Sequence, residues 1–234
     1  MKNCSIVKEV IERYKENELI MASKLYKEEL SGKISEAAYY KTLQRMCEAR
    51  ELVNIAKGTY HIPKMSKYGM VPPSEKEIIA VYTENGTGTV VGYSLYNELN
   101  LTTQISKTVT VMSSALEGFT KSIRNIVIHK IPLKFSKEII SIIHGLEVLQ
   151  NFSSIQDINY LSFLKFTEGL ASSFNEAAFN EIISVKKYKK STISFMHEIL
   201  NHYNIKNNLK DHLSTLSEYK HPKMEELYEA AYLS

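Results

Sequence analysis

Polar side chains on one face of residues 35–48 have the chemistry needed to read duplex DNA. The segment predicts a helix whose outward face carries Tyr40, Lys41, Gln44, Arg45 and Glu48. Glutamine and arginine present paired hydrogen-bonding groups that match the edges of adenine and guanine in the major groove. The alternative is that these residues are only the solvent-exposed face of an ordinary helix. The residue types alone leave both interpretations open.

The predicted elements around this helix favour the DNA-binding interpretation. Residues 5–17 and 22–29 each predict a helix, and a third begins at Ser35 after a Ser-Gly stop. Ser35 can cap the third helix, and we place it among the DNA-contacting candidates. Tyr39 and Leu43 recur at helical spacing on the opposite, inward face. Three helices in this order are expected to hold the third one against a small core.

A hairpin is predicted directly after the third helix. Residues 51–55 and 59–62 alternate like strands around a turn at Lys57-Gly58. Lys57 at the tip of this hairpin is positioned to contact a flanking phosphate. Helix, helix, helix, hairpin is the order of a winged helix-turn-helix domain, which inserts its third helix into the major groove. We therefore predict a winged helix-turn-helix DNA-binding domain over residues 1–68.

The remainder of the chain predicts a second domain over residues 69–234. A connector at 64–73 contains Gly69, Pro72 and Pro73, which makes it the best domain boundary. Residues 69–132 read as a small mixed α/β unit, and residues 133–234 as a helical region of about five helices. The β-type runs of the mixed unit are 87–91, 108–112 and 123–131. The predicted fold class is α+β.

Composition and charge bound the functional classes. The chain has 234 residues, of which 44% are hydrophobic and 24% charged, so wholesale disorder is excluded. No apolar run approaches the length of a membrane span, and we expect a cytoplasmic protein without membrane contact. Residues 1–68 hold 13 Lys/Arg against 9 Asp/Glu, a net of +4, whereas the rest of the chain has a net of −1. This asymmetry fits a polyanion partner, and a solvated basic face explains it equally well.

No catalytic or metal-binding motif is complete. Two cysteines cannot form a disulfide framework or a zinc site alone, and no cofactor is predicted. His197 and His202 are five residues apart, one too many for the zinc-protease spacing. Asp211, Glu218 and Lys220 loosely match the acidic and lysine residues of metal-dependent nucleases, which keeps a nuclease as the enzymatic alternative. We predict that the protein is not an enzyme.

One dense basic run lies in the predicted helical region. It spans residues 186–190 and contains four lysines around Tyr188. A second nucleic-acid patch with an interleaved aromatic ring is one interpretation. A solvated loop between two helices is the other, and we favour it.

Two segments of the chain resemble signatures of the AbiEi antitoxin family. Residues 43–60, LQRMCEARELVNIAKGTY, resemble the leucine, arginine and glycine-tyrosine wing signature of that family. Residues 92–104, GYSLYNELNLTTQ, resemble its second signature, a small helix that ends in a leucine-threonine-glutamine turn. The resemblance covers about residues 1–150. One departure is Arg50-Glu51, where the family usually has a glycine before the first strand of the wing.

The resemblance implies an antitoxin of a type IV toxin–antitoxin system, a class tied to abortive phage infection. The winged helix would bind inverted repeats in its own promoter, with Tyr40, Lys41, Gln44, Arg45 and Lys57 as the contacting residues. The C-terminal part would counteract a nucleotidyltransferase toxin without forming a stable complex. The alternative is a stand-alone winged-helix regulator whose C-terminal domain senses a ligand or dimerises.

Overall fold

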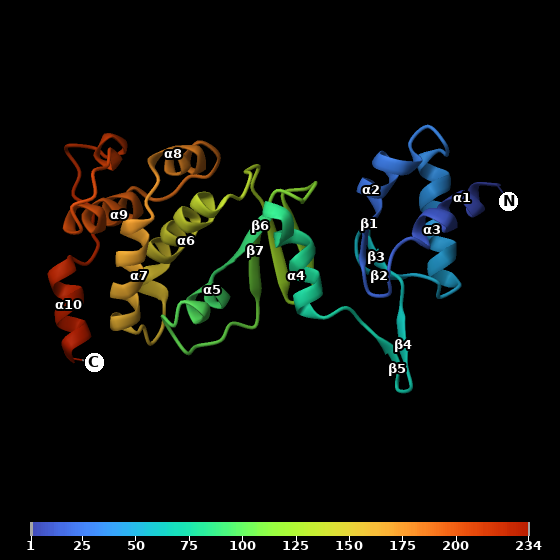
Figure 1. The fold of residues 1–234 in the computed structure, drawn as a ribbon, viewed down its shortest axis with the longest axis horizontal. Helices are drawn as coiled ribbons and strands as arrows, with labels where there is room; N and C mark the ends of the chain where they lie inside the picture. Colours follow the sequence, from blue (N-terminus) through green and yellow to red (C-terminus); the bar gives the residue numbers. More distant parts are fainter. Residues whose placement is uncertain (1, 234) are drawn as a thin grey trace. The chain divides into compact units, whose positions relative to one another are not determined.

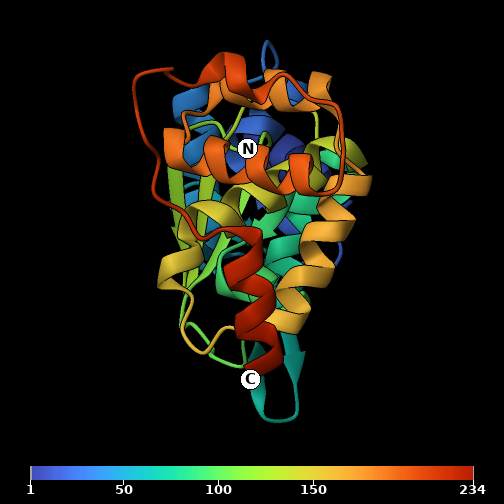
Figure 2. The ribbon, with the colours of Figure 1, turned by 90° about the vertical axis from the view of Figure 1, so that its left-hand side faces the viewer.

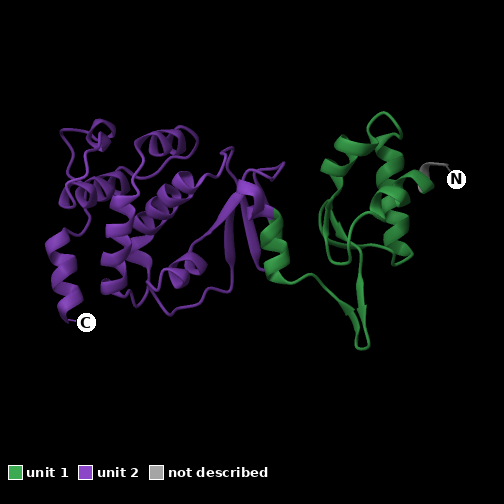
Figure 3. Ribbon diagram, viewed as in Figure 1, with its two compact units in different colours: residues 1–81, 122–124 green, residues 82–121, 125–234 purple. Residues whose placement is uncertain are grey.

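The chain folds as a mixed α/β protein, in which ten α-helices and three small sheets occur within residues 2–233 (Figure 1). A computed structural model describes these residues. Residues 1–81 with 122–124 form one compact unit, and residues 82–121 with 125–234 form a second (Figure 3). The predicted boundary after residue 68 falls in the turn of a hairpin, and the division into folding domains stays a prediction.

The first unit begins with helices that enclose a three-stranded sheet. Its strands are antiparallel neighbours in the order β1-β3-β2, and a separate hairpin pairs β4 with β5. The elements of this part of the chain are α1 (Lys2–Ile11), β1 (Leu19–Met21), α2 (Ala22–Leu25), the π-helix η1 (Tyr26–Leu30), α3 (Glu36–Glu48), β2 (Val53–Ala56), β3 (Thr59–His61), β4 (Lys64–Ser66), β5 (Gly69–Val71) and α4 (Glu75–Thr83).

Three details of this unit differ from the sequence-based expectation. The first helix ends at Ile11 rather than near Asn17, because the N–H groups of Arg13 and Tyr14 donate to carbonyls three residues back instead of four. Asn17 adopts a φ of 62°, and its N–H donates to the carbonyl of Ile62. The second helix continues as the π-helix η1. Strand β1 and the hairpin of β4 and β5 were not predicted, and the latter occupies what was expected to be a plain connector. The predicted hairpin around Lys57-Gly58 is confirmed.

The second unit places helices beside a four-stranded sheet of order β6-β7-β9-β8. Strands β6 and β7 are antiparallel, whereas β7 and β9 are parallel. Its elements are η2 (Glu84–Gly86), β6 (Gly88–Val91), α5 (Tyr93–Glu98), β7 (Val109–Ser113), β8 (Thr120–Ile123), β9 (Ile126–Lys130), α6 (Lys137–Asn151), η3 (Phe152–Ser154), α7 (Tyr160–Ser172), α8 (Glu176–Val185), α9 (Lys190–His202), η4 (Leu209–His212) and α10 (Met224–Leu233). The sequence predicted three strands here, and the third predicted run, 123–131, contains β9 and only the last residue of β8, so β8 was not predicted.

Helix α6 is the centre of the second unit. Its apolar residues Ile142, Ile143 and Leu146 are fully buried, as their spacing predicts. Helix α10 packs along α7 and leads to the C-terminal end (Figure 2). Leu161 on α7 is an apolar residue that lies 56% exposed. Within residues 2–233, no helix combines the length and the apolar character that crossing a membrane requires.

His144 joins α6 to the sheet and makes the stability of the second unit depend on pH. Its Nε2 shares a hydrogen bond of 2.7 Å with the Thr89 hydroxyl, and burial lowers its pKa from 6.5 to about 4. Because the folded state favours the neutral ring, this contribution is complete above pH 6.5 and is lost as the pH falls toward 4. Between pH 7.5 and pH 5 we expect a loss of about 2 kcal/mol in the free energy of unfolding.

Urea unfolding of the wild type and of His144→Gln at these two pH values measures this loss. Between pH 7.5 and pH 5, the free energy of unfolding of the variant should fall by about 2 kcal/mol less than that of the wild type. His129→Gln removes an exposed histidine of the same unit and serves as the control. Equal pH dependence in the wild type and in His144→Gln would contradict the assignment.

Candidate nucleic-acid interface

The exposed face of α3 carries three of the predicted DNA-contacting side chains. Lys41, Gln44 and Arg45 are exposed, while the inward residues Tyr39 and Leu43 are fully buried. Inward and outward residues therefore separate on α3 as the helical period requires. This leaves a long donor-rich face free to meet a polyanion.

Ser35 and Tyr40 occupy different positions from the three exposed residues. Ser35 is the N-cap of α3, where its hydroxyl accepts a hydrogen bond of 3.4 Å from the N–H of Ala38. Tyr40 was expected to face outward, but it is half-buried, and its ring lies 5.2 Å from the ring of Tyr39. Because Tyr40 directly follows Tyr39, it lies at the edge of the buried face of α3. Only part of its ring is therefore accessible to a ligand.

Gln44 has a partner on its own helix. Its amide nitrogen donates a hydrogen bond of 3.1 Å to the carboxylate of Glu48, one turn further along α3. Bidentate contact with adenine requires both the amide N–H and the amide oxygen of a glutamine. An exposed hydrogen bond of this kind contributes about 1 kcal/mol or less, so a base edge can replace Glu48 at small cost.

Lys57 lies in the turn between β2 and β3, and Ala22 links this turn to α3 through two hydrogen bonds. The N–H of Ala22 donates to the carbonyl of Gly58 at 3.0 Å, and the carbonyl of Ala22 accepts a hydrogen bond of 3.1 Å from the hydroxyl of Tyr39. The Lys57-Gly58 turn and the N-terminal half of α3 are therefore both attached to the start of α2. Lys57 itself is exposed. This shared attachment links the turn, through Ala22, to the half of α3 that a helix-turn-helix protein uses.

The hydrogen bond from Tyr39 to Ala22 is a testable part of this arrangement. The pKa of Tyr39 is raised above its ordinary value, mainly because its hydroxyl is buried. The hydroxyl therefore stays protonated and donates. Tyr39→Phe should lower the free energy of unfolding by about 1 kcal/mol, because one buried hydrogen bond is lost. Urea unfolding measures this, with Tyr68→Phe as the control, since Tyr68 is exposed in the turn between β4 and β5. An unchanged stability of Tyr39→Phe would show that this bond does not hold α3.

Arg50 adopts an unusual backbone conformation at the entrance to the hairpin. Its φ is 59°, in the left-handed region that glycine occupies without steric cost. It directly follows Ala49, the C-cap of α3, and allows the chain to leave the helix toward β2. Arg50 was expected on the same stripe as Tyr39, but it lies beyond the helix and is exposed.

The comparisons with known proteins do not identify this chain. No family model, curated protein or solved structure matches it.

The residues considered for metal-dependent cleavage do not form a metal site. Asp211 is exposed in η4, and Glu218 and Lys220 are exposed in the segment between η4 and α10. Among the described residues, no group of three His, Cys, Asp or Glu is arranged to hold a metal ion. His197 bonds to two asparagine side chains, while the ring of His202 lies 5.0 Å from that of Tyr203.

The basic run between α8 and α9 is attached to α6 through its tyrosine. Tyr188 is buried, and its hydroxyl donates a hydrogen bond of 2.8 Å to the carboxylate of Glu147. Lys186 forms an ion pair with the same carboxylate at 3.5 Å. Burial raises the pKa of Tyr188, so the hydroxyl remains a donor. A buried Tyr188 cannot stack on a base, so the interpretation as an aromatic nucleic-acid patch loses its aromatic residue.

Sequence reasoning missed Ala22 and strand β1, which together position the hairpin. Ala22 follows β1 directly, and β1 pairs with β3 so that Met21 lies opposite Thr59. The only sequence signal was the short apolar pair Leu19-Ile20, which is too brief to predict a strand by alternation.

Proposed function

We propose that the first unit binds duplex DNA as a winged helix-turn-helix domain, with α3 in the major groove and the Lys57-Gly58 turn on a flanking phosphate. The observation that carries this proposal is the exposed set of Lys41, Gln44 and Arg45 on a helix attached to that turn through Ala22. The element order α1-β1-α2-α3-β2-β3 and the sheet order β1-β3-β2 support it. In this scheme the buried face of α3 sets its position, and the exposed face reads sequence.

The side chains divide into two roles. Lys41 and Lys57 neutralise phosphates and release counterions, which provides affinity for any duplex. Gln44 and Arg45 pair with base edges, which provides preference for one sequence. Two copies of the chain on inverted repeats would add their contacts on one promoter. The protein acts in this account as a repressor of its own operon and performs no catalysis.

The resemblance to the AbiEi family extends the proposal to the second unit. There the chain would counteract a nucleotidyltransferase toxin, without a stable complex, in the cytoplasm. The conformation of Arg50 supports the resemblance, because its φ of 59° suits the glycine that the family usually has at this point. Residues for the antitoxin activity are not assigned.

Fluorescence anisotropy tests the DNA-binding part. The full chain is titrated against the duplex upstream of its own gene and against a scrambled duplex of the same length, at two salt concentrations. We expect tighter binding to the upstream duplex and a steep loss of affinity with salt. Equal or absent binding to both duplexes would contradict the proposal.

Co-expression tests the antitoxin part. The chain is expressed together with a neighbouring nucleotidyltransferase gene, and we expect it to restore the growth that the toxin arrests. A chain that binds its promoter but does not restore growth would be a stand-alone regulator. That outcome would remove the antitoxin function and leave the DNA-binding function in place.

A further inference from the structure

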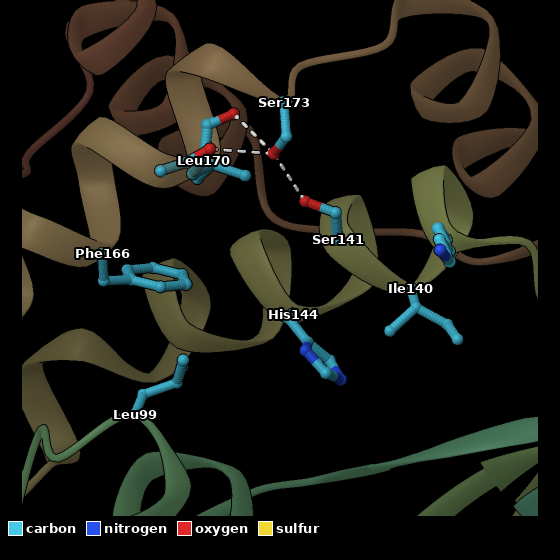
Figure 4. Close-up of a pocket in the computed structure, with 9 residues that line it drawn as sticks. Leu99, Ile140, Ser141, His144, Phe166, Leu170 and Ser173 are labelled. Carbon is cyan, nitrogen blue, oxygen red and sulfur yellow. Dashed lines mark hydrogen bonds between the residues drawn. The ribbon is translucent and has the colours of Figure 1, made fainter.

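A pocket of about 450 Å³ opens in the second unit between α6, α7 and the end of α5. Figure 4 shows the side chains of Leu99, His144 and Phe166 around this space, each from a different segment. Its volume falls in the range typical of sites for small organic molecules. The DNA-contacting residues proposed above all lie in the first unit, so this pocket is separate from them.

One wall of the pocket is formed where a helix presents no side chain. Gly169 on α7 lines the space, and a Cβ atom added there would meet no other atom within 4 Å. One residue further, Leu170 packs closely against Gly145 of α6 and keeps the two helices in contact. The helices therefore touch beside the pocket and remain apart at Gly169.

The walls of the pocket are mostly apolar. Leu99, Ile140, Phe166 and Leu170 line it, and an apolar ligand body would remove their surfaces from water. The hydroxyls of Ser141 and Ser173 lie 2.8 Å apart at its border, and the Ser173 hydroxyl also bonds to the carbonyl of Gly169 at 2.9 Å. Because these hydroxyls already form hydrogen bonds with each other and with the backbone, they do not need a polar ligand group as a partner.

The charge at the pocket has a single sign. Of its nine lining residues, Lys137 is the one that carries charge at neutral pH, because His144 is held neutral by burial. Lys137 is exposed at the first position of α6, one turn before Ile140 and Ser141, and therefore lies on the same helix face. No carboxylate is among the lining residues. An apolar cavity with one cation at its border complements an apolar body that carries one negative group.

We propose that this pocket binds a small amphipathic carboxylate, with its apolar body between α6 and α7 and its carboxylate at Lys137. The pocket is lined only by residues of the second unit, so this proposal does not rest on DNA binding by the first. Charge-assisted hydrogen bonds from lysine hold such carboxylates, while the apolar walls set the size of the body.

Fluorescence titration of the full chain with anilinonaphthalene sulfonate, an apolar anion, tests this site. We expect saturable binding at one site per chain. Gly169→Phe fills the space and should abolish this binding, whereas Gly118→Phe should not, since Gly118 also has open space around it but lies outside the pocket. Lys137→Gln, an exposed substitution, should weaken binding of the sulfonate probe by about five- to tenfold. It should leave binding of phenylnaphthylamine, the same ring system without the charge, unchanged.

Competition identifies the ligand body. Displacement of the probe by decanoate indicates a long aliphatic chain, and displacement by naphthoate indicates a flat aromatic one. Displacement by neither would contradict the carboxylate assignment. Unchanged sulfonate affinity in Gly169→Phe, with a wild-type circular dichroism spectrum, would place the probe elsewhere and overturn the proposal. Unchanged affinity in Lys137→Gln would also overturn it.

Discussion

Replacing both proposed base-reading side chains, Gln44→Ala together with Arg45→Ala, is expected to weaken binding to the chain's own upstream duplex by about 2–4 kcal/mol. This corresponds to roughly a 30- to 1,000-fold rise in Kd. Each side chain offers a bidentate pairing with one base, and the two substitutions leave those base edges without a partner. Both residues are exposed on α3, so their loss should not disturb the fold. Anisotropy titration with the upstream and the scrambled duplex measures the effect.

Two further variants separate base reading from charge. Lys57→Ala should weaken binding to both duplexes alike and reduce the slope of log K against log salt by about 1, because one phosphate contact is lost. Arg13→Ala removes an exposed arginine outside α3 and the turn, which pairs with Glu29 at 2.9 Å, and should change neither the affinity nor the salt slope. If the double variant weakened both duplexes equally, Gln44 and Arg45 would contact phosphates, and the assignment of α3 as the reading helix would be wrong.

Gly88→Ala is expected to lower the free energy of unfolding of the second unit by about 3–5 kcal/mol. A Cβ at this position would lie inside contact distance of two backbone carbonyl oxygens, those of Tyr82 and Met112. Gly88 begins β6 and pairs with Ser113 of β7, next to Met112, while Tyr82 lies near the end of α4. Neither carbonyl can therefore move without a shift of β7 or of the end of α4. Backbone atoms cannot rotate away as the end of a flexible side chain can.

Gly118→Ala is the matched control for this substitution. A Cβ at Gly118 meets no atom within 4 Å, and we expect a change within about 0.5 kcal/mol. Urea unfolding of both variants and of the wild type provides the comparison. A stability of Gly88→Ala equal to that of the control would mean that β6 and β7 are not paired in this register.

Helix α3 could be predicted because its signals are local. Ser35 caps it, and Tyr39 and Leu43 recur on one face, so both its start and its buried side follow from adjacent residues. Strand β1 could not be predicted in this way. It is three residues long and forms only because β3 supplies its hydrogen-bonding partners from forty residues further along the chain. Asn17, expected at the end of the first helix, likewise bonds to a distant residue, because its N–H donates to the carbonyl of Ile62.

The residue types of the candidate interface were readable from sequence, but their assembly was not. Periodicity separates Lys41 and Gln44 from the core, yet it says nothing about where the Lys57 turn lies. That position depends on the two backbone hydrogen-bonding groups of Ala22, an alanine with no chemistry to mark it. The pocket in the second unit was equally hidden, because Gly169 becomes significant only when α6 and α7 pack together.

Hydrogen–deuterium exchange of the full chain, with and without the upstream duplex, tests the DNA contact most directly. The account predicts slower exchange in the N-terminal half of α3, residues 35–45, and in the Lys57-Gly58 turn, because both would be covered by the duplex. A bound duplex that slows exchange only within residues 125–233, and leaves α3 and the turn unchanged, would contradict it.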